Sequence, residues 1–97
     1  MVIGSLTVRL LVRESRTLKD KRQVVRSILD RARAGFNVSA AEVATHDDVK
    51  VATLGFAVAA AETETARGVL NQIADALRLH PVAEYLGGEV AVGREVV

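Results

Sequence analysis

The fold is decided by residues 2–35, which read VIGSLTVRLLVRESRTLKDKRQVVRSILDRARAG. Over residues 2–12 every second residue is apolar or glycine, which is the period of a half-buried strand. Farther on, apolar residues recur every three or four positions, which is the period of an amphipathic helix. Thr17 and Asp20 have the spacing of a capping box, so we predict a helix over residues 18–34 that ends at a Gly35 cap.

The next segment predicts a hairpin. Residues 36–46 and 50–61 have strand character, and His46-Asp47-Asp48 between them is typical of a turn. The phase of the first strand is ambiguous at residues 41–43, where a bulge would let Val43 point inward. The inward parity of the second strand is predicted to comprise Ala52, Leu54, Phe56 and Val58.

A second helix and a last strand complete the chain. Thr63 is placed to cap the helix, and Pro81 is placed to stop it. Gly68 inside this helix costs about 1 kcal/mol relative to alanine, which a close backbone approach could justify. Residues 89–96 alternate as a strand, and Gly87-Gly88 predicts a turn or a bulge ahead of it.

The order strand, helix, strand, strand, helix, strand predicts one α+β domain over residues 1–97. Right-handed crossovers make it a ferredoxin-like βαββαβ sandwich, with a four-stranded antiparallel sheet and two helices on one face. The other face would be largely apolar, with Ile3, Leu11, Val51 and Ala57, and with Ala59 or Val43 as further candidates. Because monomers rarely expose a large apolar patch, we expect a homo-oligomer, most simply a dimer; the alternative is that scattered small apolar residues are tolerated there.

Composition excludes several classes of protein. The 97 residues include no cysteine, which rules out disulfides, thiolate zinc sites and cysteine catalysis and fits a cytoplasmic setting. The longest stretch without charge, Val51–Ala61, is too short to cross a membrane as a helix, and we find no signal peptide. His46 with Asp47 and Asp48 is better explained as a turn than as a metal site. No nucleophile is spaced to work with a histidine, so we expect no catalytic residues, no metal and no cofactor.

Positive charge is concentrated in and just before the first predicted helix. The net charge is only +1, yet residues 9–33 hold nine basic and three acidic side chains, which makes that segment +6. Lys19, Lys21, Arg22 and Arg26 are therefore candidates for contacts with nucleic-acid phosphates. Of these, Lys19, Arg22 and Arg26 lie close to one stripe of the predicted helix, together with Arg33. The alternative is a solvated helix face with local ion pairs, such as Asp30 with Arg26 or Arg33.

A polar run on the second predicted strand forms another candidate site. Asn37, Ser39 and Glu42 could hydrogen-bond a partner or ligand, or they could mark only the wetted parity of an edge strand. No aromatic residue lies on the first strand, and Phe56 is expected to face the core, so base stacking on the sheet is disfavoured.

Two motifs carry a resemblance to a known family. Residues 17–22, TLKDKR, and residues 36–43, FNVSAAEV, resemble the YlxP-like family, a bacterial family of about this length and of unknown function. The likeness covers nearly the whole chain, including the opening Val2-Ile3-Gly4 strand and the His46-Asp47 turn. The chain departs from the family at Thr17, where serine is common, at Asp20, where glutamate is frequent, and in lacking an aromatic after the turn.

The resemblance implies a ferredoxin-like fold and a cytoplasmic setting, and it assigns no catalytic residues. Genes of the family often lie among those for translation initiation and ribosome maturation factors. We therefore expect a non-enzymatic accessory protein that contacts RNA or a ribosomal subunit. The alternative is a regulatory small-molecule-binding module that acts as a homo-oligomer.

Overall fold

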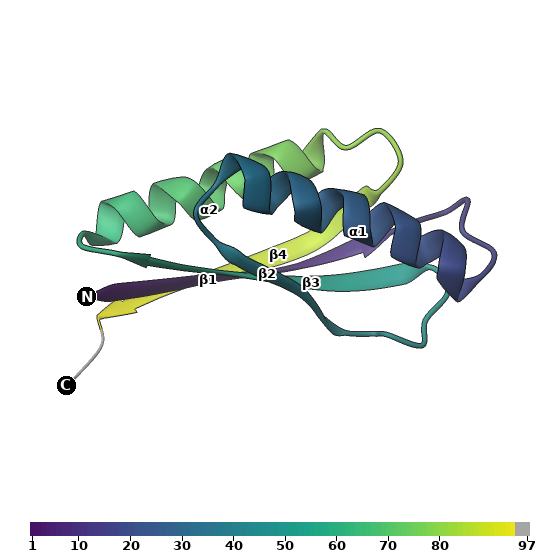
Figure 1. The fold of residues 1–97 in the computed structure, drawn as a ribbon, viewed down its shortest axis with the longest axis horizontal. Coiled ribbons are helices and arrows are strands. Elements are labelled where there is room, and N and C mark those ends of the chain that lie inside the picture. The colour runs from purple at the N-terminus through teal and green to yellow at the C-terminus, as the bar shows by residue number, and fades with distance from the viewer. Residues whose placement is uncertain (95–97) are drawn as a thin grey trace.

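The computed structural model describes residues 1–94. Its elements are β1 (Val2–Leu11), α1 (Leu18–Gly35), β2 (Ser39–Ala44), β3 (Val51–Ala60), α2 (Thr63–Arg78) and β4 (Glu84–Arg94). All neighbouring strands are antiparallel, and the order across the sheet is β2-β3-β1-β4. Both helices lie on the same side of the sheet (Figure 1). The predicted ferredoxin-like βαββαβ fold is confirmed.

The core lies between the sheet and the helices. On β1 the buried residues alternate with exposed ones along the whole strand, as its period predicts. Gly4 lets α2 approach this strand closely, because a Cβ atom there would stand 2.9 Å from Leu70 Cδ1. The predicted inward parity of β3 is also confirmed. The largest fully buried apolar side chains are Phe56, Leu6, Leu10, Leu54 and Leu70.

Helix α1 begins at the predicted capping box. The Asp20 backbone N–H donates to Thr17 Oγ1 over 3.1 Å, and the Thr17 N–H donates to Asp20 Oδ2 over 3.2 Å. The predicted end of this helix is right to within one residue, but the cap is not the predicted glycine. Gly35 is the last helical residue, and Phe36, in an extended conformation, is the cap. Among residues 1–94 no glycine has a positive φ, so Gly35 does not form a left-handed cap.

Helix α2 starts without a side-chain cap. Glu62 occupies the cap position and makes no side-chain hydrogen bond to the helix, so the prediction that Thr63 caps it is wrong. The helix ends at Arg78, before Pro81. A Cβ atom on Gly68 would meet nothing within 4 Å, so no close backbone approach explains this glycine.

The β2–β3 hairpin is present, but β2 is shorter than predicted. Its register shifts between Glu42 and Ala44, which confirms the predicted bulge. The bulge does not turn Val43 inward, however. Val43 is 53% exposed and sits over Gly55 on the open sheet face, where a Cβ atom at position 55 would be 2.8 Å from Val43 Cγ1. A side chain at position 55 would therefore force the exposed Val43 side chain to move.

Strand β4 is longer than predicted. Gly87 and Gly88 lie inside it and pair with Arg9 and Val8, so they form no turn. The irregularity just before them, where the register with β1 shifts, agrees with the alternative of a bulge. Of the residues predicted for this strand, Glu95 and Val96 lie outside the described part of the chain.

Within residues 1–94 the second sheet face carries no helix (Figure 1). Ile3 on this face is 44% exposed. A hollow of about 450 Å³ lies on this side of β1, β2 and β3, lined mainly by small residues that include Ala41, Gly55 and Ala57. Neither helix within residues 1–94 has the length and apolar character needed to cross a bilayer.

Candidate nucleic-acid interface

Three of the predicted phosphate-binding residues share an exposed face of α1. Lys19, Arg22 and Arg26 are exposed, and intervals of three and four residues bring them to one side of the helix. Within the described residues none of the three forms an ion pair with a carboxylate. We call these three residues the α1 cationic face. Their charges are available to an anionic partner.

Arg33 lies next to this face, but its guanidinium group already has partners within the protein. Its Nη1 atom is 3.4 Å from Asp30 Oδ1, and its Nη2 atom donates to the carbonyl of Ala40 on β2. The predicted ion pair of Asp30 therefore forms with Arg33 and not with Arg26. The alternative that these cations form local ion pairs therefore holds for Arg33 and does not hold for the α1 cationic face.

Lys21 does not belong to this face, so the prediction that it contacts phosphates is wrong. Its side chain is completely buried. Nζ donates to the carbonyls of Thr45 (2.7 Å) and Val51 (3.1 Å) and lies 3.1 Å from Glu42 Oε2. The physical reason is its position: Lys21 precedes Val25 by four residues, so it lies on the apolar stripe that faces the sheet.

The loop after β2 is shaped to surround the Lys21 ammonium group. Thr45 has a φ of 58°, a strained conformation for a β-branched residue. Its hydroxyl is 2.9 Å from the Thr53 hydroxyl and donates to the carbonyl of Ala44 over 2.7 Å. His46 Nε2 is 3.0 Å from the Glu42 carbonyl oxygen. These bonds hold the Thr45 backbone where its carbonyl meets Lys21.

The rest of this loop is a turn, as predicted. Asp48 Oδ1 accepts hydrogen bonds from the backbone N–H groups of Val51 (2.9 Å) and Lys50 (2.8 Å), and these bonds lower the pKa of Asp48. Lys50 Nζ donates to the carbonyls of Arg13 and Ser15, which ties the hairpin loop to the β1–α1 connection. In the described part of the chain, His, Asp and Glu side chains form no group of three that could hold a metal ion.

The polar run Asn37, Ser39 and Glu42 is divided by the fold. Asn37 is exposed in the connection before β2, and Ser39 is exposed on β2 beside the hollow of the open face. Glu42 points the other way, toward α1, and its buried Oε2 atom has the Lys21 ammonium group as its ionic partner. The structure therefore does not bring these three residues together as one site.

Lys21 and Glu42 come from the two motifs that carried the family resemblance, and they meet at 3.1 Å. A family model described as "Protein of unknown function (DUF503)" matches residues 3–89. The chain belongs to the DUF503 family. This confirms the resemblance to YlxP-like proteins. In this DUF503 protein the two motifs build a buried ionic contact between α1 and the end of β2.

Comparison with solved structures finds a distant similarity to a REP-associated tyrosine transposase bound to a REP hairpin. The identity is 16% and the TM-score is 0.43, over 97% of this chain. The chain spans 57% of the length of that transposase chain. No curated protein matches the sequence.

Proposed function

We propose that this DUF503 protein is a non-enzymatic, cytoplasmic accessory factor that binds the phosphate backbone of RNA, free or in a ribosomal subunit. One observation supports the proposal most: Lys19, Arg22 and Arg26 stand exposed on one face of α1 with no carboxylate partner among residues 1–94. Unpaired cations in a row are suited to contacts with successive phosphates.

The geometry favours recognition of phosphates over recognition of bases. Lys19 and Arg26 are seven residues apart, or about 10 Å along the helix axis, so the face can contact more than one phosphate. Phe56 is buried in the core, and no aromatic residue of β1 or β3 lies on the open sheet face. Bases therefore have no stacking platform there, and binding should depend little on sequence.

Filter retention of a labelled single-stranded RNA tests the proposal. The variant R22E/R26E reverses two charges of the α1 cationic face and should abolish retention at low salt. The control R67E/R94E makes the same change in net charge at two exposed arginines elsewhere and should retain RNA. Equal loss in the two variants would show a mere net-charge effect and overturn the proposal. Co-sedimentation with ribosomal subunits then distinguishes free RNA from the particle.

We further propose that the protein acts as a homodimer, with a second copy covering the open sheet face. Besides its apolar residues this face carries Arg9 on β1 and Glu89 on β4, both exposed. Neither forms an ion pair within residues 1–94. A two-fold axis that brings Arg9 of one copy to Glu89 of the other also brings Glu89 of the first copy to Arg9 of the second, because a two-fold interface is self-complementary. The face is thus matched in charge to itself.

A further inference from the structure

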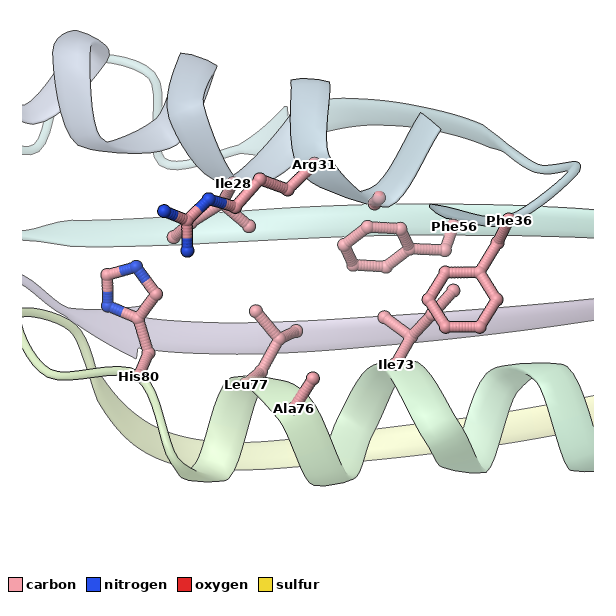
Figure 2. A pocket seen from close by; sticks show the side chains of 9 residues that line it. Ile28, Arg31, Phe36, Phe56, Ile73, Ala76, Leu77 and His80 are labelled. Carbon is pink, nitrogen blue, oxygen red and sulfur yellow. The ribbon is translucent and has the colours of Figure 1, made fainter. Parts of the chain in front are cut away.

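A pocket opens between the two helices, above the sheet. Its volume is about 190 Å³, and seven of its nine lining residues are apolar. Figure 2 shows the rings of Phe36 and Phe56 at one end, with Ile28 and Leu77 toward the other. The two phenylalanines of the chain thus line one cavity, which is formed from both helices and the central sheet.

The other end of the pocket is polar. There the guanidinium group of Arg31 and the imidazole of His80 face each other (Figure 2). His80 Nδ1 accepts hydrogen bonds from the backbone N–H groups of Val82 (3.1 Å) and Ala83 (3.0 Å), which assigns the ring proton to Nε2. Arg31 forms no ion pair with a carboxylate of residues 1–94. Two donors therefore meet at this end, and neither side chain can accept from the other.

We propose that this pocket binds a small apolar monocarboxylic acid, with its carboxylate between Arg31 and His80 and its hydrocarbon part against Phe36 and Phe56. A carboxylate accepts from both donors at once, and the planar guanidinium group matches its two oxygens. With the imidazole neutral, Arg31 is the one charged residue among the described residues that line this pocket. A singly charged anion balances that charge, whereas a phosphate dianion would not.

The volume limits the size of the ligand. A protein cavity of about 150 Å³ holds one benzene molecule, so this pocket suits a single ring or a short branched chain. The site is also separate from the α1 cationic face. Arg31 lies five residues after Arg26, about 140° farther around the helix axis, so ligand binding and RNA binding can fail independently.

NMR titration with phenylacetate tests the proposal, with phenylacetamide as the uncharged control. Phenylacetate should shift the backbone amide signals of α1 and α2 around the pocket in a saturable way. Phenylacetamide should bind at least about tenfold more weakly, which is the effect of losing one charged hydrogen bond. Equal affinity for the two compounds, or no saturable shift with phenylacetate, would overturn the proposal.

Two variants locate the site. Arg31→Gln should weaken phenylacetate binding at least about tenfold and bring it near the affinity for the amide. Ala76→Leu places a larger side chain on the pocket wall and should abolish binding while the protein stays folded, as its thermal melt would show. Unchanged phenylacetate affinity in either folded variant would contradict the assignment. RNA retention should be the same as in the wild type for both.

Discussion

At the scale of single residues, Lys19 and Lys21 show how the same type of side chain can serve opposite purposes two residues apart on a helix. Lys19 and Arg22 stay in solvent, while Lys21 holds the end of the β2–β3 hairpin from inside. A buried charge of this kind is tolerated because oxygen atoms surround it. Removing it leaves Glu42 and the carbonyl groups of Thr45 and Val51 without their donor.

We therefore predict that Lys21→Met lowers the free energy of unfolding by about 3–5 kcal/mol, the usual cost of breaking a buried ion pair. The matched control Lys19→Met changes an exposed lysine on the same helix and should alter stability by at most about 0.5 kcal/mol. Urea unfolding followed by circular dichroism measures both values. A Lys21→Met variant as stable as the wild type would contradict the structural role assigned to this residue.

His80 makes stability depend on pH. Burial lowers the pKa of His80, and the nearby Arg31 guanidinium group lowers it further. The unfolded chain therefore takes up a proton near the ordinary value of 6.5, before the folded chain does. This difference in pKa stabilises the folded protein fully above about pH 6.5, the ordinary pKa of histidine. The stabilisation is lost as the pH falls from there toward the lowered pKa of His80 in the folded state. Protonation of Nδ1 would also break the bonds from Val82 and Ala83.

His80→Asn keeps an acceptor in place of Nδ1 but does not titrate. The melting temperature of the wild type should fall as the pH is lowered from about 7.5 to about 5.5, and that of His80→Asn should fall less. The lowered pKa values of Asp20 and Asp48 act only below this range, because both start from 3.8. Parallel pH profiles of the two proteins would rule out His80 as the titrating group.

At the scale of elements, replacing two glycines by alanine should change the stability of the protein in opposite directions. Gly68 lies in α2 with open space around its missing side chain, whereas Gly4 lies in β1 against Leu70. Gly68→Ala should stabilise the protein by about 1 kcal/mol through helix propensity. Gly4→Ala should destabilise it, because the new Cβ atom forces Leu70 or the helix to shift. Thermal melts of the two variants give the comparison. A destabilised Gly68→Ala variant would mean that the helix needs a glycine there.

The elements themselves could be predicted from the sequence because their patterns are local. The alternation in β1 and the Thr17–Asp20 capping box were sufficient to predict the opening strand and helix. The bounds of β2 and β4 were less predictable, since they depend on pairing with strands distant in the sequence. Val43 is the clearest case: the bulge was predicted, but its direction depends on the space above Gly55.

The candidate interface could be predicted only in part. Helical spacing was sufficient to predict that Lys19, Arg22 and Arg26 lie on one exposed face. Lys21 was misplaced, although its position on the apolar stripe four residues before Val25 was a usable signal. Nothing in the sequence indicated the pocket at Arg31 and His80. Arg31 comes from α1 and His80 from the segment after α2, and only the tertiary fold brings them together.

At the scale of the whole molecule, the layers place the proposed functions on different surfaces. The helices lie on one side of the sheet, and the open face is on the other (Figure 1). If a second copy covers the open face, Ala57→Arg should produce a monomer by placing a charge within the apolar patch. The control Ala76→Arg, on the helical side, should remain a dimer. Light scattering coupled to size-exclusion chromatography measures the mass, and a wild-type monomer at micromolar concentration would contradict the pairing.

The salt dependence of RNA binding tests the role of the α1 cationic face most directly, because it counts the phosphates that are neutralised. With three contacts to single-stranded RNA, the logarithm of the affinity should fall with the logarithm of salt concentration with a slope of about −2. Neutralising two residues in R22Q/R26Q should reduce the slope to about −0.7, whereas R67Q/R94Q should keep the slope of the wild type. A slope that R22Q/R26Q leaves unchanged would contradict the assignment of RNA binding to this helix.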